Sequence, residues 1–343
     1  MEKLKKFYNK NYKFFIILPL VLFIISLLYL FYFYFQTGDL FYKDISLTGG
    51  TTLSLFLEVN EKDLSNLLSQ KTENFEIKTI TDSTGRRVSV VLTFPEDKTE
   101  EIISSLEDFL GQKLTQDNSS IEKTSSSLSK NFHDQLISSI ILAFFLMSMV
   151  VFLIFAKGKK IKFLVIILNI ILAFLIKFSF SSNSLSFFSK VFLFFISIFL
   201  VIMYIKFSVP SFAVMFAAAS DIILTLAIIN LLEIKLSTAG IVAFLMLLGY
   251  SVDTDILLTT RVLKRKNTSI NEELFKAFKT GITMTLTSMA SLLLALIFIY
   301  RFQSVLNQIF TILLIGLTFD IFNTWAFNAS LIKWFAEKNE THV

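Results

Sequence analysis

The stretch "GYSVDTDILLTTRVLKRK", residues 249–266, closes an apolar run that begins near Thr238 and places two aspartates inside that run. The run is long enough to cross a bilayer, since a spanning helix needs roughly 17 to 25 mostly apolar residues. It ends in the basic cluster "RVLKRK" (261–266), which is typical of the cytoplasmic boundary of a membrane helix. The stretch therefore predicts a membrane helix whose buried charges have a function.

The composition of the chain agrees with a lipid environment. Of 343 residues, 54% are hydrophobic and 17% are charged, and the mean hydropathy is +0.67. A soluble domain usually carries about 25% charged residues. The absence of cysteine excludes disulfides, zinc–thiolate sites and a thiol nucleophile. We predict an α-helical multi-pass membrane protein.

Eight apolar runs are candidates for membrane crossings. The first run follows the basic start "MEKLKKFYNKNYK" and is too long for the apolar core of a signal peptide, so we expect it to remain as an anchor. Eight crossings place every basic cluster on the cytoplasmic side when the N-terminus is cytoplasmic. The runs are 14–35, 136–156, 161–178, 187–207, 210–232, 238–260, 281–300 and 307–332.

The long hydrophilic segment 37–130 is then extracytoplasmic, and it holds 16 Asp and Glu against 10 Lys and Arg. Its pattern predicts a small α+β domain with the order βαββαβ, which is ferredoxin-like. The expected elements are a strand in 45–59, a helix in 61–70, a hairpin over 75–94 turning at Ser83-Thr84-Gly85, a helix in 97–112 and a strand in 118–130.

Asp221 is the deepest carboxylate in the apolar pattern. It lies 11 residues after Pro210, near the centre of a hydrocarbon layer about 30 Å thick. A charge there costs at least about 2.5–3.5 kcal/mol on insertion scales, so such residues usually face a bundle interior and mark ion paths. The alternative is a protonated aspartate that joins two helices, which the small residues "AAAS" (217–220) would allow to approach closely.

The two acids of the opening stretch flank one helix face. At about 100° per residue, Thr254 and Arg261 share a face, and Asp253 and Asp255 lie on either side of it. We expect one acid to face a neighbouring core helix and the other to face a cavity or Arg261. The alternative for Arg261 is an ordinary basic anchor at the membrane boundary.

Two further runs carry polar faces, and together with the aspartates they predict three or four helices around a hydrated seam. Hydroxyls and amides alone more often join helices, whereas aspartates favour transport. The polar residues are Thr280, Thr287, Ser288 and Ser291 in the first of these runs, and Asp320, Asn323, Thr324 and Asn328 in the second.

Signatures of soluble enzymes are missing from the sequence. The two histidines, His133 and His342, lie at a membrane border and next to the C-terminal end, and there is no P-loop, HExxH or GxSxG motif. We expect no enzymatic activity, no cofactor, no metal site and no nucleic-acid partner.

Four blocks resemble the SecF family, in its archaeal form, and they occur in the family's order over most of the chain. The first holds Thr48, Gly49, Gly50 and Thr51, and the third holds Gly249 and Tyr250. The blocks are "LTGGTTL" (47–53), "AAASDIILTLAII" (217–229), "LLGYSVDTDILLTTRVLKR" (247–265) and "IGLTFDIFNTWAFNASLIKW" (315–334).

This resemblance implies an accessory subunit of the Sec protein translocase. The implied partners are SecD, a SecYE-type channel, the translocating polypeptide and membrane lipid, in the cell membrane. The buried acids, with Arg261, would couple a proton or sodium gradient to movement of the outer domain. Alternatives are a small-molecule or lipid exporter of the resistance-nodulation-division (RND) superfamily, which normally carries two such bundles in one chain, and a purely structural scaffold.

The chain also departs from the family pattern. Ser46 stands where many bacterial members have aspartate, and the acids at 253 and 255 replace acids at the positions of Thr254 and Thr260. About 50 extra residues predict an inserted transmembrane hairpin. The expected organisation is 1–36 (cytoplasmic N-terminus and first helix), 37–130 (extracytoplasmic domain), 131–157 (second helix), 158–207 (inserted hairpin) and 208–343 (four-helix region with the acidic and polar motifs).

Overall fold

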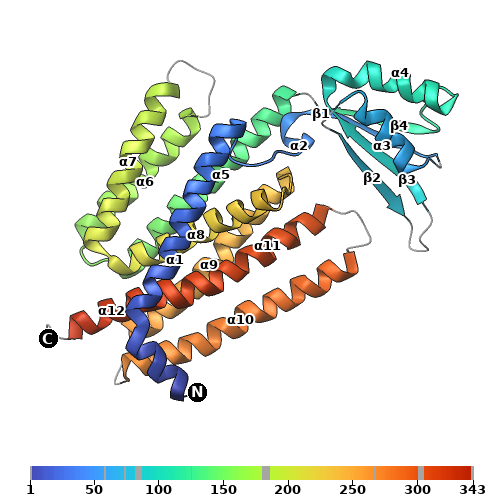
Figure 1. Ribbon diagram of the computed structural model, residues 1–343. Coiled ribbons are helices and arrows are strands. Elements are labelled where there is room, and N and C mark those ends of the chain that lie inside the picture. Colours follow the sequence, from blue (N-terminus) through green and yellow to red (C-terminus); the bar gives the residue numbers. More distant parts are fainter. Residues whose placement is uncertain are drawn as a thin grey trace.

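The computed structural model describes residues 2–57, 59–72, 75–81, 87–124, 126–179, 186–265, 268–299 and 305–340. Figure 1 shows a bundle of long helices with a small sheet domain at one end. Both ends of the chain lie at the opposite end of the bundle (Figure 1).

The long helices follow the apolar runs, because a helix satisfies all its backbone hydrogen bonds internally where water is absent. Within the described residues, seven helices are long and apolar enough to cross a membrane. α6, which contains the predicted run 161–178, is not one of them, so the eighth crossing stays a prediction. The helices are α1 (Glu2–Thr37), α5 (Ser126–Phe155), α6 (Lys159–Ser179), α7 (Ser186–Phe207), α8 (Val209–Leu231), α9 (Thr238–Leu263), α10 (Ile270–Ile299), α11 (Val305–Phe322), the π-helix η2 (Asn323–Asn328) and α12 (Ala329–Glu340).

The sheet domain contains four antiparallel strands in the order β2-β3-β1-β4, with two helices on one face. Alternating side chains explain this arrangement: Leu53 and Leu55 of β1 point to the same core as Leu92 of β3, and Leu64 and Ile102 reach that core from the helices. The elements are β1 (Gly50–Leu55), α3 (Glu61–Ser69), β2 (Glu76–Thr81), β3 (Arg87–Phe94), η1 (Glu96–Lys98), α4 (Thr99–Leu110) and β4 (Ser119–Thr124).

The predicted fold class, a helical membrane bundle with one ferredoxin-like α+β domain, is confirmed. The first strand is shorter than expected, because Ile45–Thr48 form the helical turn α2 and Gly49 then takes a left-handed φ of 86° before β1 begins. α5 begins at Ser126, so it projects beyond the expected start of the second helix at residue 131. The predicted turn at 83–85 lies outside the described residues.

α6 and α7 form a hairpin that packs against α5 and α8, at one side of the bundle (Figure 1). Phe152 of α5 contacts Tyr204 of α7, with ring centroids 5.0 Å apart. Inside the hairpin, the buried Asn169 side chain donates from Nδ2 to the carbonyl oxygen of Val165 at 2.8 Å and lies 3.4 Å from the Tyr204 hydroxyl. The hairpin lies within residues 158–207, for which an insertion stays a prediction, and neither of its two helices carries a carboxylate.

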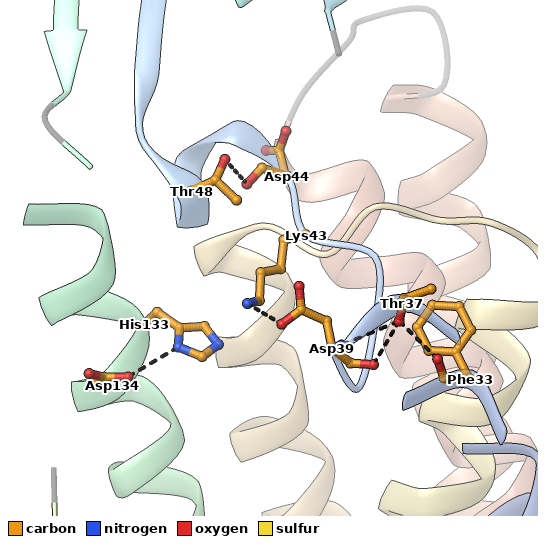
Figure 2. A network of polar contacts seen from close by, with 8 residues as sticks. All are labelled: Phe33, Thr37, Asp39, Lys43, Asp44, Thr48, His133 and Asp134. Atoms are coloured by element: carbon orange, nitrogen blue, oxygen red, sulfur yellow. Dashed lines mark hydrogen bonds and ion pairs between the residues drawn. The ribbon is translucent and has the colours of Figure 1, made fainter. Parts of the chain in front are cut away.

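The segment 38–44, which leads from α1 into the sheet domain, is bonded to the loop 232–237 between α8 and α9. The Leu236 N–H donates to the Tyr42 carbonyl at 2.7 Å, and the Asp44 N–H donates to the Leu236 carbonyl at 2.9 Å. Figure 2 shows the polar contacts around this segment, including the ion pair between Lys43 and Asp39 at 2.5 Å. The sheet domain is therefore attached to the α8–α9 loop as well as to α1.

Candidate functional site

Asp221 of α8 is completely buried in the centre of the bundle. Its Oδ2 accepts a hydrogen bond from the Ser251 hydroxyl of α9 at 2.6 Å, and its Oδ1 accepts one from Asn323 Nδ2 of η2, also at 2.6 Å. One carboxyl group thus contacts donors from two other segments. A buried polar group needs such partners, because leaving it unpaired costs several kcal/mol.

Asp255 of α9 and Asp320 of α11 are also completely buried. Asp255 Oδ1 accepts hydrogen bonds from the Thr324 hydroxyl at 2.8 Å and from Asn328 Nδ2 at 2.6 Å. The same Thr324 hydroxyl lies 3.2 Å from Asp320 Oδ1. A hydroxyl has one proton to donate, so Thr324 serves one of the two carboxyl groups at a time.

Asp221, Asp255 and Asp320, hereafter the carboxylate cluster, are close enough for their charges to interact. Within the described residues, no lysine, arginine or histidine pairs with any of them. Asp255 Oδ2 and Asp320 Oδ2 are buried without a hydrogen-bond partner. Three carboxyl groups without a balancing cation have the chemistry of a site that takes up and releases protons or a cation.

The π-helix η2 aligns the amides that bind the cluster. In an α-helix, residues five apart point about 140° away from each other. The wider turn of a π-helix reduces this angle, which brings Asn323 and Asn328 toward the same side. The two amides bind Asp221 and Asp255, respectively. Single π-turns inside helices are frequent at functional sites.

Small residues allow the helices to approach closely around the cluster. A Cβ atom added at Gly316 of α11 would lie 2.4 Å from Leu247 of α9, and one added at Gly281 of α10 would lie 2.6 Å from the Trp325 ring. Ala217 and Ala218 of α8 are buried next to Asp221 in the chain. The backbone positions that hold the three carboxyl groups together therefore depend on glycine and alanine.

The structure separates the remaining predicted residues from the cluster. Asp253 is exposed on the outside of α9, whereas Asp255 faces the core, so the two acids point apart as their spacing requires. Arg261 is half-buried near the end of α9, and its charge interacts with Glu273 of α10. Six residues separate Arg261 from Asp255, which is about 9 Å along the axis of α9, so the coupling role of Arg261 stays a prediction.

The polar face of α10 also lies elsewhere. Thr287 and Ser291 are exposed, and their hydroxyls donate to carbonyls of their own helix, those of Thr283 and Thr287, at 2.9 and 3.0 Å. The expectation that this face lines the seam is therefore wrong. The cluster is formed by α8, α9, α11 and η2.

The residues of the family motifs occupy two places. Thr51 is buried at the start of β1, where its hydroxyl lies 2.5 Å from that of Thr99 in α4. Thr48, before Gly49 and Gly50, donates from its hydroxyl to the Asp44 carbonyl at 3.5 Å (Figure 2). Gly249 and Tyr250 are exposed on α9, far from the sheet domain.

Sequence reasoning missed Ser251 as a donor to the cluster. Its position four residues before Asp255 places both side chains on the same face of α9, which is the signal that could have identified it. Among the described residues, no group of three or more His, Cys, Asp or Glu side chains is arranged to hold a metal ion.

Comparison with known families gives a match in the part of the chain that holds the cluster. Residues 173–338 match the family model described as protein export membrane protein SecD/SecF, C-terminal. These residues contain α8 to α11, η2 and most of α12, and with them all three acids of the cluster.

Curated relatives match over a similar length. The chain is 51% identical over 132 residues to the protein-export membrane protein SecF of Methanothermobacter thermautotrophicus, covering 38% of this chain and 46% of the relative. The SecF proteins of Methanocaldococcus jannaschii and Pyrococcus furiosus are 48% and 41% identical over 138 and 140 residues, which are 39% and 41% of this chain and 49% and 47% of theirs. Each match thus spans about half the length of the relative.

Among solved structures, the fold resembles that of SecDF from Thermus thermophilus, described as a translocon-associated membrane protein. The TM-score is 0.55 at 16% sequence identity, and the match covers 96% of this chain and 38% of that chain. At this identity the likeness shows the fold alone, and it includes both the helical bundle and the sheet domain because nearly the whole chain is covered.

Proposed function

Through residues 173–338 the chain belongs to the SecD/SecF family of protein-export membrane proteins, and on that premise we propose that it assists protein export as a SecF-type subunit. The observation that carries this proposal is the carboxylate cluster, which lies inside the matched region. It is a group of buried acids without a balancing cation, in helices that cross the membrane. We infer a non-enzymatic role in which ion movement, and not ATP hydrolysis, supplies the energy.

The cluster offers a way to respond to an ion gradient. When a carboxyl group gains or loses a proton, its charge changes and so does the set of donors that it prefers. Ser251, Asn323, Thr324 and Asn328 supply those donors from α9 and η2. Protonation would therefore shift the balance between two packings of α8, α9 and α11. The coupling ion is a proton or sodium.

The three helices that carry the cluster converge on the loop 232–237. α8 leads into this loop and α9 leaves it, and α11 binds it through Gln308, whose Nε2 donates to the Lys235 carbonyl at 2.5 Å. Gln308 Oε1 also accepts from the backbone N–H and the hydroxyl of Ser237. A rearrangement of the cluster helices is thus expected to reach this loop.

The loop is in turn bonded to the segment that enters the sheet domain. Besides the backbone bonds of Leu236 with Tyr42 and Asp44, Asn230 at the end of α8 donates from Nδ2 to the Leu40 carbonyl at 2.7 Å. We propose that these bonds transmit a shift in the bundle to the sheet domain, which would contact the emerging polypeptide.

Orientation and partners follow from charge and from the relatives. The segment 37–130 is acidic and the helical part is basic, which supports an extracytoplasmic sheet domain and a cytoplasmic N-terminus. The chain covers 38% of the solved SecDF chain, so we propose SecD as the partner that supplies the remaining half of such an assembly, beside a SecYE-type channel. Asp253, Gly249 and Tyr250, exposed on α9, are candidates for contact with that partner.

The experiment that tests this function replaces Asp221 by asparagine. Asp221→Asn keeps the side-chain volume and one oxygen to accept a hydrogen bond, but it cannot titrate. We expect normal insertion and association with SecD, and loss of the export that depends on the ion gradient. Asp221→Glu should retain part of this export. The matched control is Asp134→Asn, the same chemical change in a carboxylate at the outer end of α5.

Gradient-dependent export in Asp221→Asn equal to that of the unmodified chain would reject the coupling role of this residue. A triple variant, with asparagine at Asp221, Asp255 and Asp320, then decides about the cluster as a whole. If it also exports normally, the chain is a structural scaffold of the translocase.

A further inference from the structure

One acid of a membrane-spanning helix points away from the bundle. α9 is long and apolar enough to cross a membrane from Thr238 to Leu263, and Asp253 is exposed on the outside of this helix. Leu263, where the helix ends, lies about 15 Å from Asp253 along the axis, and Thr238 lies about 22 Å away in the other direction. An aspartate side chain has a single methylene group, so its carboxyl group stays inside a hydrocarbon layer about 30 Å thick.

The Asp253 carboxyl group has no partner among the described residues, since none of them donates a hydrogen bond to it or forms an ion pair with it. Asp255, two residues further along, is completely buried and accepts hydrogen bonds from two side chains of η2. An ionisable group at membrane depth is costly when it faces lipid, so such groups almost always face protein or water. This cost indicates that the outside of α9 is covered in the assembled protein.

The exposed residues of α9 lie on one face of the helix. Positions three or four residues apart share a face, and the exposed ones in α9 are Val242, Met246, Gly249, Tyr250 and Asp253, hereafter the α9 stripe. The other faces of α9 pack against α5, α8, α10 and α11. Nothing lies within 4 Å of a Cβ atom added at Gly249, and glycine lets the backbone of another helix approach closely. The stripe thus has the shape of a face on which one more membrane helix packs.

The charge of Asp253 selects among the candidate occupants of the α9 stripe. Lipid tails offer neither a cation nor a hydrogen-bond donor, so they leave the cost of the carboxyl group unchanged. Two copies of the chain related by a two-fold axis normal to the membrane would bring two Asp253 carboxyl groups together at one depth, and like charges repel. A basic side chain neutralises the carboxylate and donates hydrogen bonds to it.

We propose that a membrane helix of a partner chain packs on the α9 stripe and places a lysine or arginine side chain against Asp253. Charged residues inside membranes pair with one another because each charge reduces the cost of the other. This inference rests on the partnership proposed above, in which SecD is the chain that supplies the helix. It adds the chemistry that SecD must present, which is a basic residue at the depth of Asp253.

Such a pair would fix the rotation of α9 about its axis. Asp253 lies about 200° around the helix from both Ser251 and Asp255, so the stripe and the carboxylate cluster are on opposite sides of α9. The helix that binds the stripe therefore holds Ser251 toward Asp221 and Asp255 toward η2. The partner would influence the cluster through α9 without contacting the cluster itself.

The first experiment identifies the covering helix. Tyr250, which is 43% exposed on the stripe, is replaced by p-benzoylphenylalanine, a photoreactive amino acid of similar shape. The complete chain is produced together with SecD and irradiated in membranes, and the attached peptide is sequenced by mass spectrometry. We expect a peptide from a membrane helix of SecD with a lysine or arginine within about two helical turns of the attachment site.

The second experiment tests the charge. In Asp253→Leu, the basic residue of the partner is left buried without its acid, so the amount of SecD that co-purifies should fall at least about tenfold. Met246→Leu, an apolar change on the same stripe, is the matched control and should stay within about twofold. Replacing the identified basic residue by leucine in the Asp253→Leu background should restore co-purification to roughly half or more, because two apolar side chains leave no unpaired charge.

Unchanged co-purification in Asp253→Leu, attachment to lipid alone or to a second copy of the chain, or attachment to a helix without lysine or arginine would overturn the proposal. Restoration by the second leucine supports it, since a change in the partner cannot repair a folding defect in this chain. Attachment to a basic helix of a chain other than SecD supports the charge pairing and rejects SecD as the partner. The export function itself is judged separately by Asp221→Asn.

Discussion

Thr324 is the residue on which two of the buried acids depend at once. Its hydroxyl lies 2.8 Å from Asp255 and 3.2 Å from Asp320, and it can donate one proton. When Thr324 serves Asp320, Asp255 keeps the bond from Asn328; when Thr324 serves Asp255, Asp320 must find another donor or carry its own proton. The hydroxyl thus links the protonation of one acid to the hydrogen bonding of the other.

Replacing this hydroxyl by a methyl group should weaken the folded protein. Thr324→Val keeps the shape but leaves a buried carboxyl group without a donor, so we expect the free energy of unfolding in detergent to fall by about 1–3 kcal/mol. The control is Thr283→Val, where an exposed hydroxyl donates to the Lys279 carbonyl of its own helix at 2.8 Å. There the change should stay within about 0.5 kcal/mol. Equal costs at both positions would contradict the role of Thr324.

At the scale of single residues, the sequence predicted which acidic residue is deeply buried better than it predicted toward which neighbour an acidic side chain points. The position of Asp221 within its apolar run was enough to predict that it is buried inside the bundle. Asp253 and Asp255 lie in the same run, 200° apart by helical geometry, so the pattern requires that they point apart but cannot say which one faces the core. That choice depends on where η2 packs, which is tertiary information.

The π-helix η2 is the element that the sequence could not reveal. Its residues have no distinctive propensity, and the polar pattern of Asn323, Thr324 and Asn328 reads as one face of an ordinary helix. The π-turn is stabilised by its surroundings. Trp325 packs against Gly281 of α10 and contacts the Phe278 ring edge-on, with ring centroids 5.0 Å apart. The ring centroids of Phe327 and Phe216 lie 4.5 Å apart. Packing against the neighbouring helices therefore determines that residues 323–328 form a π-helix and not an α-helix.

Gly281 should be sensitive to the smallest possible enlargement. A Cβ atom there would lie 2.6 Å from the rigid Trp325 ring and 3.0 Å from the Thr254 side chain. Gly281→Ala should therefore displace η2 and lower the free energy of unfolding by about 1–3 kcal/mol. Gly249→Ala is the matched control, because nothing lies within 4 Å of its added Cβ. It should be neutral or stabilising by up to about 1 kcal/mol. A neutral Gly281→Ala would show that η2 is not held by this contact.

The bonded pair of the segment 38–44 and the loop 232–237 should move as one unit. The chain has no cysteine, so a disulfide between Lys43→Cys and Leu236→Cys can be formed where these residues form a β-bridge. Because the segment 38–44 and the loop 232–237 are already paired at this bridge, we expect the oxidised variant to retain its gradient-dependent export. Export that is lost on oxidation and restored by a reductant would show instead that the two segments must separate.

For the whole molecule, the sequence predicted the helical bundle and the ferredoxin-like domain, because long apolar runs and period-two alternation are local signals. The sequence could not predict that α10 contributes no side chain to the cluster. The hydroxyl-rich face of α10 has the pattern of a polar seam, and only the positions of the neighbouring helices show otherwise. The predicted count of eight crossings depends on α6, whose run is flanked by Lys159, Lys160 and Lys177. The bonds from Gln308 of α11 to the loop 232–237, and from that loop to the segment 38–44, connect the cluster helices with the sheet domain.

The most direct test of the central claim measures ion movement. Vesicles that contain the chain with SecD, the channel and a translocating polypeptide would enclose a dye sensitive to protons or to sodium. We predict that the polypeptide accelerates dissipation of the gradient, that Asp221→Asn abolishes this acceleration and that Asp134→Asn retains it. An unchanged acceleration in Asp221→Asn would contradict the claim that the carboxylate cluster couples the ion gradient to export.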